Sequence, residues 1–118
     1  MKLIKMSEGE SYEPEKDWKR ISLCNQSDIS IEHFIKPAGH QSPKHNHPNA
    51  QVLMVLKGKI VVIGEFEEIE LTEGDTIYIP GDEKHVVKNP LDTVSIGIDI
   101  FVPGRSFDFW LNKLKENK

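Results

Sequence analysis

The chain of 118 residues has one cysteine, no long apolar run and no cluster of positive charge. The lone Cys24 excludes an internal disulfide and fits a reducing cytosol. No apolar stretch is long enough to cross a bilayer, and the N-terminus lacks the pattern of a signal peptide. We therefore expect a cytoplasmic protein without a membrane partner. The net charge of -4, with no basic stripe, argues against a nucleic-acid partner.

The length allows one hydrophobic core, so we expect a single domain over residues 1–118. Residues 1–19 are mostly polar and charged, with Trp18 as a large apolar side chain near their end. This composition predicts an N-terminal arm, and the core should begin after it.

The rest of the chain alternates β-rich segments with turns that contain glycine or proline. We expect strands over residues 29–35, 51–56, 60–63, 68–71, 76–79 and 93–102. Strands about ten residues apart indicate an antiparallel sandwich or barrel. Only residues 106–115 have apolar side chains at helical spacing, which predicts a short C-terminal helix.

Histidine and glutamine residues form the clearest candidate site. His45, His47 and Gln51 are all odd-numbered, so in an extended chain their side chains point to one side. His85 can join them from a distant hairpin. Neutral nitrogen and oxygen donors that converge in this way suit a divalent nickel, manganese, iron, cobalt or zinc ion. Residues 43–49 also have the composition of a polar surface loop, and the sequence pattern leaves both interpretations open.

Two groups of residues resemble the two motifs of the cupin family. The first group is Gly39, His45, His47, Gln51 and Gly58, and the second is Gly74, Pro80, His85 and Asn89. The two motifs span residues 39–89. The resemblance implies an all-β fold, the double-stranded β-helix or jelly-roll barrel, whose mouth holds a metal. The implied ligands are His45, His47, Gln51 and His85.

Gln51 stands where the family motif has a glutamate, which makes the ligand set neutral. A neutral set favours Lewis-acid chemistry on hydroxyl or carboxylate oxygens. The two-histidine, one-carboxylate set of many non-haem iron oxygenases is absent, although some cupin oxygenases use three histidines. Gln51 could alternatively form only a hydrogen bond to a neighbouring side chain.

A narrower resemblance lies in the last strand. Asp99, Phe101 and Arg105 are spaced as in the pectin-degradation cupins, which convert 4,5-unsaturated uronate monomers to linear keto-uronates. The resemblance implies that Asp99 and Arg105 are catalytic and that Phe101 and Arg105 bind an anionic substrate. Asp99 suits proton transfer, Arg105 suits a carboxylate, and Phe101 suits an apolar wall.

Other roles for these residues remain open. Asp99 could orient a ligand histidine, Arg105 could pair with Asp108, and Phe101 could belong to the core. The alternative functions are a cupin dioxygenase acting on a small organic acid and a non-catalytic cupin that binds a small anion. We also expect His33 to face the barrel interior together with Ile31 and Ile35, and the chain to form a homodimer through exposed sandwich edges.

Overall fold

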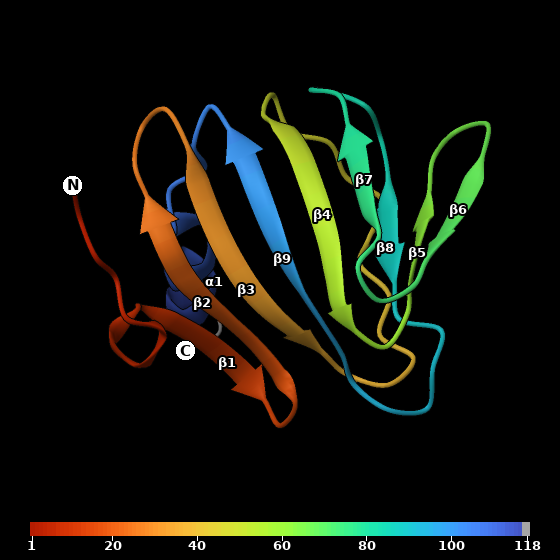
Figure 1. Ribbon diagram of the computed structural model, residues 1–118, viewed down its shortest axis with the longest axis horizontal. Helices are drawn as coiled ribbons and strands as arrows, with labels where there is room; N and C mark the ends of the chain where they lie inside the picture. The colour runs from red at the N-terminus through yellow and green to blue at the C-terminus, as the bar shows by residue number, and fades with distance from the viewer. Residues whose placement is uncertain (117–118) are drawn as a thin grey trace.

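Figure 1 shows the computed structural model of the protein, which describes residues 1–116. Residues 117 and 118, the end of the expected domain, lie outside this range. The elements in chain order are η1 (Met6–Glu8), β1 (Ser11–Glu15), β2 (Trp18–Asn25), β3 (Ser30–Lys36), β4 (Ala50–Lys57), β5 (Ile60–Ile63), β6 (Glu68–Leu71), β7 (Thr76–Ile79), β8 (Val86–Lys88), β9 (Ser95–Val102) and α1 (Asp108–Glu116). Among the described residues, no helix has the length and apolar character needed to cross a membrane.

The strands form two antiparallel sheets (Figure 1). The larger sheet has six strands in the order β1-β2-β3-β9-β4-β7, and the smaller has three in the order β6-β5-β8. Apolar side chains from both sheets make a common core, formed by Phe34, Leu53, Val55, Ile60, Val62, Leu71, Ile79 and Val87. This arrangement confirms the predicted jelly-roll sandwich with a short C-terminal helix.

The sequence locates six of the strands and misses β1, β2 and β8. The strands β5, β6 and β7 have the expected bounds, and β3, β4 and β9 differ from expectation by at most two residues at either end. Residues 1–19 are more than a polar arm, because β1 and the start of β2 lie there. In β1 only Tyr12 is buried, against the rings of Trp18 and Trp110. One buried residue in five leaves no alternating pattern to detect.

The expectation that His33 faces the interior is wrong. The buried residues of β3 alternate from Ser30 to Lys36, so Glu32 and Phe34 point inward, whereas Ile31, His33 and Ile35 point outward. The neighbouring β9 follows the same rule: Asp99 points inward, and Ile98 beside it points outward. Both strands therefore turn polar groups toward the interior and isoleucines toward the outside, which inverts the usual pattern.

The outer face of the larger sheet is strongly apolar. Its central strands contribute half-buried Ile31, Ile35, Ile96, Ile98, Ile100, Val52 and Met54. Helix α1 lies on the opposite, inner side, where Trp110 Nε1 donates a hydrogen bond to Glu32. A contiguous apolar sheet face of this kind is typical of a protein–protein interface.

We expect two copies of the chain to pair through this face, because a two-fold axis can match an apolar sheet surface to itself. The substitution Ile98→Asp places a charge between His33 and Met54 in the middle of the face. It should convert a dimer to a monomer in sedimentation velocity. The matched variant Ile63→Asp, on β5 of the smaller sheet, should leave the dimer intact. A parent chain that is monomeric at every concentration would contradict this prediction.

Close packing at Gly97 fixes β9 against its neighbours. A Cβ at this position would clash with the Phe34 ring and lie 2.6 Å from the Met54 carbonyl oxygen. We expect Gly97→Ala to lower the free energy of unfolding by about 1–3 kcal/mol, the usual cost of overpacking. Gly64→Ala is the control, because its nearest contact would be an ordinary 3.6 Å to the Glu67 carbonyl oxygen. Urea unfolding measures both, and equal losses would refute the packing argument.

Candidate functional site

Three histidines meet at one end of the interior. His45 and His47 lie in the loop before β4, which begins at Ala50, and His85 immediately precedes β8. The backbone of His45 pairs with that of His85 through hydrogen bonds of 3.1 and 2.9 Å. One ring nitrogen from each of the three histidines lies within 4.8 Å of the others. The three side chains therefore converge as predicted. The reason differs from the one expected, since His45 and His47 are not in a continuous strand and the isolated backbone bridge between His45 and His85 brings the two segments together.

Backbone carbonyl groups orient all three rings. The Nδ1 atoms of His45, His47 and His85 lie 2.8, 2.9 and 2.7 Å from the carbonyl oxygens of Pro43, Asn49 and Glu83. A carbonyl oxygen can only accept a hydrogen bond, so each Nδ1 carries the hydrogen. In the neutral rings the Nε2 lone pairs are then available, which is the tautomer that metal-binding histidines commonly adopt.

Gln51 adds a fourth donor in a fixed orientation. Its Nε2 donates to Asp99 Oδ1 at 2.7 Å, which turns its Oε1 toward His47 Nε2, 3.1 Å away. With its hydrogen on Nδ1, the His47 ring presents an Nε2 lone pair beside the Oε1 lone pairs of Gln51, so the two atoms can share one bound cation. His85 Nε2 is also buried, and it has no hydrogen-bond partner among residues 1–116. The donor set of His45, His47, Gln51 and His85 thus fits a divalent transition metal.

Burial keeps the imidazoles of His45 and His85 neutral. Burial is the largest influence on the pKa of both His45 and His85, and it lowers both below the ordinary imidazole value. It outweighs the hydrogen bonds to the Pro43 and Glu83 carbonyl groups, which act in the opposite direction. Both rings are therefore unprotonated at neutral pH and free to act as ligands.

The structure brings Asp99 and Phe101 of β9, and Arg105 from the connection between β9 and α1, to the same interior. Asp99 is buried on β9, where it bonds to Gln51, and Phe101 lies with its ring 5.4 Å from the His47 ring. Arg105 stacks over Phe101 at 4.1 Å. Its Nη2 lies 3.2 Å from Glu32 Oε1, so Arg105 pairs with Glu32 and not with Asp108. Its Nε is buried and has no partner among the described residues.

Two charged residues that the sequence analysis missed hold this group together. Arg20 Nη1 lies 2.7 Å from Asp99 Oδ2 and 3.1 Å from Glu32 Oε1. Glu32 also accepts a 2.7 Å hydrogen bond from Trp110 Nε1. The buried positions of β3 alternate, so a correct choice of the inner face would have revealed Glu32. The sequence carries no comparable signal for Arg20.

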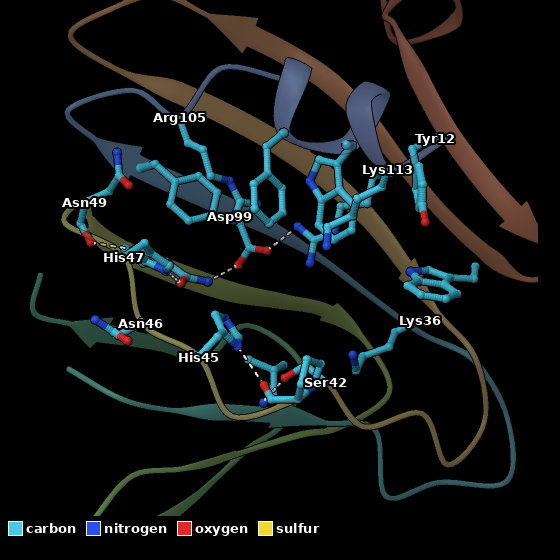
Figure 2. Close-up of a pocket in the computed structure, with 18 of the residues that line it drawn as sticks. Tyr12, Lys36, Ser42, His45, Asn46, His47, Asn49, Asp99, Arg105 and Lys113 are labelled. Atoms are coloured by element: carbon cyan, nitrogen blue, oxygen red, sulfur yellow. Dashed lines mark hydrogen bonds and ion pairs between the residues drawn. The ribbon is translucent and has the colours of Figure 1, made fainter. Parts of the chain in front are cut away.

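Most of these side chains, although not Glu32 or His85, line a cavity of about 620 Å³, a volume typical of small-molecule sites (Figure 2). His45, His47 and Gln51 form one part of its wall. The rest combines charged and aromatic side chains, among them Trp18, Arg20, Lys36, Asp99, Phe101, Arg105, Phe109 and Trp110. The close-up shows Asp99, Arg105 and His47 together, with Lys36 well separated from His47. The cavity can therefore place a small polar ligand against both the donor cluster and a carboxylate.

Removing two of the ligands should abolish metal binding. We expect His45→Ala combined with His85→Ala to retain no nickel, manganese or zinc after loading and desalting, as measured by mass spectrometry of the metal. The control is His33→Ala, which removes a histidine from the outer sheet face. If the double variant keeps as much metal as the parent, the ligand assignment is wrong.

Comparisons with known proteins agree with this architecture. Two uncharacterized proteins of Methanocaldococcus jannaschii are each 31% identical to this chain, over 68 and 61 residues. These matches cover 57% and 51% of this chain, and 59% and 49% of the relatives. The chain therefore aligns with less than two thirds of the length of either relative.

Solved structures share the whole fold. An RmlC-like cupin from Shewanella frigidimarina has a TM-score of 0.79 at 26% identity, over 91% of this chain and 94% of that one. The protein KdgF from a Halomonas species has a TM-score of 0.79 at 24% identity, over 92% of this chain and 98% of that one. At this identity the likeness supports the fold alone. The cupin domain profile matches residues 32–101, which include most of β3 and β9 and all four candidate metal ligands. The chain belongs to the cupin family.

Proposed function

We propose that this cupin is a metal-dependent enzyme that opens 4,5-unsaturated uronate monomers to linear keto-uronates. The observation that carries the proposal is the buried Asp99 carboxylate, which lines the same cavity as His45 and His47 and is joined to His47 through Gln51. The spacing of Asp99, Phe101 and Arg105, which resembles that of the pectin-degradation cupins, gives the substrate class. A cytosolic location and a small anionic partner are part of this proposal.

His45, His47, Gln51 and His85 would hold the metal. When bound, a divalent ion supplies Lewis-acid stabilisation of hydroxyl or carboxylate oxygens. The protein's own contribution is to present neutral donors in fixed orientations. The backbone carbonyl groups fix the histidines, and Asp99 fixes Gln51.

Asp99 is the group that moves the proton. Its carboxylate accepts the proton of the anomeric hydroxyl, while the bond between the anomeric carbon and the ring oxygen breaks. The former hydroxyl oxygen becomes an aldehyde oxygen, and the ring oxygen stays on carbon 5 as the oxygen of an enolate whose double bond joins carbons 4 and 5. Return of the proton to carbon 4 converts the enolate to a ketone, so substrate and product are isomers. Arg20 and Gln51 hold one oxygen of Asp99 each and thus fix its direction.

Phe101 and Arg105 form the wall beside this proton path. The Phe101 ring meets the His47 ring edge-on, at an interplanar angle of 80°, and Arg105 covers it. A flat apolar surface of this kind suits the face of a sugar ring. The Arg105 Nε–H, which has no partner among the described residues, is available to donate to a ligand oxygen.

A non-catalytic cupin that binds a small anion is the second candidate. The observation that favours it is the pairing of both Asp99 oxygens, with Gln51 and with Arg20. In such a protein Asp99 would only support the cavity wall. The predicted dioxygenase differs from both candidates because it would consume oxygen in the presence of iron and a substrate acid.

Loss of the Asp99 carboxylate should abolish ring opening. We expect Asp99→Asn to lower kcat by about 100-fold or more, the usual contribution of a general acid or base. The measurement is the loss of the ultraviolet absorbance of the conjugated double bond, with metal-loaded protein and freshly released unsaturated monouronate. A blank without protein corrects for spontaneous opening of the sugar.

Asp28→Asn is the matched control, because Asp28 lies in the exposed turn before β3. It should retain the parent rate. Metal analysis of each variant separates loss of the proton acceptor from loss of the metal. A metal-loaded parent that is no faster than the blank would remove this substrate class, and oxygen uptake would then test the dioxygenase alternative.

A further inference from the structure

A buried lysine lies in the cavity away from the histidine cluster. Lys36 is the last residue of β3, on the inward face that also carries Glu32 and Phe34, and its exposure is only 7%. It lines the same cavity as His45 and His47, and Figure 2 shows it well separated from His47. Lysine is rarely buried to this extent without a charged partner. The position of Lys36 in the cavity therefore calls for a functional explanation.

Lys36 has no carboxylate partner among residues 1–116. Its Nζ makes one hydrogen bond there, of 2.8 Å, to His40 Nδ1. The other buried cations of the cavity differ in this respect, because Arg20 pairs with Asp99 and Arg105 pairs with Glu32. Two carboxylates balance two arginines, so the positive charge of Lys36 is left without a balancing charge beside it.

The surroundings of Lys36 prepare it to receive an anion. Burial, and then the nearby Arg20, lowers its pKa to about 7, although Asp99 acts in the opposite direction. A negative group beside Nζ would offset this cost and stabilise the charged amine. His40 is neutral at pH 7, because burial and the charges of Lys36 and Arg20 lower its pKa to about 4. Its Nδ1 can thus accept from Lys36, while two other Nζ hydrogens remain to donate.

An aromatic ring forms the neighbouring wall of this region. The Trp18 ring packs on the His40 ring at a centroid distance of 4.4 Å, and both side chains line the cavity. Trp18 is in turn held by Tyr12, whose ring is 5.9 Å away. The ammonium group of Lys36 is therefore fixed beside a rigid, partly apolar surface. Such a site can hold one charged group of a ligand while the remainder extends toward the histidines.

We propose that Lys36, positioned by His40 and Trp18, binds the carboxylate of a sugar acid whose other end reaches the histidine cluster. Lys36 takes this role instead of Arg105, because the Arg105 guanidinium is already paired with Glu32. The subsite makes the cavity selective for acidic over neutral sugars. This inference rests on the part of the proposed function that assigns a sugar acid as the ligand, and it does not depend on the reaction.

The test compares an acid with its neutral counterpart. With metal-loaded full-length protein, Lys36→Met should raise the KM for the unsaturated monouronate by about 10- to 100-fold, the range expected for a charge-assisted hydrogen bond. The kcat should change little. The KM for the methyl ester of the same sugar should stay at its parent value, because the ester carries no charge.

Two further variants keep the test decisive. Lys36→Arg retains the charge and should recover much of the affinity for the acid. Lys59→Met removes a lysine that pairs with Glu70 on an exposed hairpin, and it should change nothing. Thermal unfolding checks that each variant is folded. If folded Lys36→Met binds the acid as tightly as the parent does, or if it loses acid and ester equally, the carboxylate subsite is refuted.

Binding of unreactive sugars separates this inference from the proposed reaction. Calorimetry with galacturonate and galactose should show that the parent prefers the acid and that Lys36→Met loses this preference. If the parent shows that preference without ring-opening activity, the reaction is wrong and the subsite stands. If the parent opens unsaturated uronate and Lys36→Met keeps the parent KM, the reaction stands and the subsite is wrong. A parent that neither turns over the acid nor binds galacturonate overturns the subsite.

Discussion

Two buried carboxylates on adjacent strands impose the main constraint on this protein. Glu32 and Asp99 are directly opposite each other in the register of β3 and β9, and their exposures are 1% and 2%. Like charges at paired sheet positions repel, and burial makes each charge expensive. Arg20 resolves the conflict because one of its nitrogens bonds both carboxylates. Its own burial acts to lower its pKa, but Asp99 and Glu32 outweigh that effect and the pKa is raised.

The same charge network places the other parts of the site. From Asp99 the network continues through Gln51 to His47. The hydrogen bonds between β9 and β4 therefore fix the position of the Asp99 carboxylate relative to the donor cluster. From Glu32 it continues to Trp110, which holds α1 against the inner side of the larger sheet. The apolar core between the two sheets adjoins this network at Phe34, whose ring lies 5.3 Å from the Arg20 guanidinium. The interior thus has an apolar part that stabilises the fold and a polar part that forms the cavity.

Sequence reasoning found the donor cluster but not most of the cavity around it. The spacing of His45, His47 and Gln51 predicts that their side chains point to one side, because the alternation of side chains along an extended chain is a local property. The backbone bridge from His45 to His85 depends instead on tertiary structure. Glu32 and Lys36 were missed because the isoleucines beside them appeared to mark the inner face. Choosing the correct face requires knowing that β3 pairs with β9, whose Asp99 faces inward, and strand pairing is not a local property.

The backbone carbonyl groups that hold the three Nδ1 atoms have a further consequence for how the proposed metal site would be loaded. Each carbonyl is two residues from its histidine in the chain, so these contacts form with the local backbone and do not depend on an ion. Loading and exchange of the metal then require little rearrangement of the fold. Donors of this kind suit several first-row metals, so the supply of each metal in the cell would decide which one the proposed site holds.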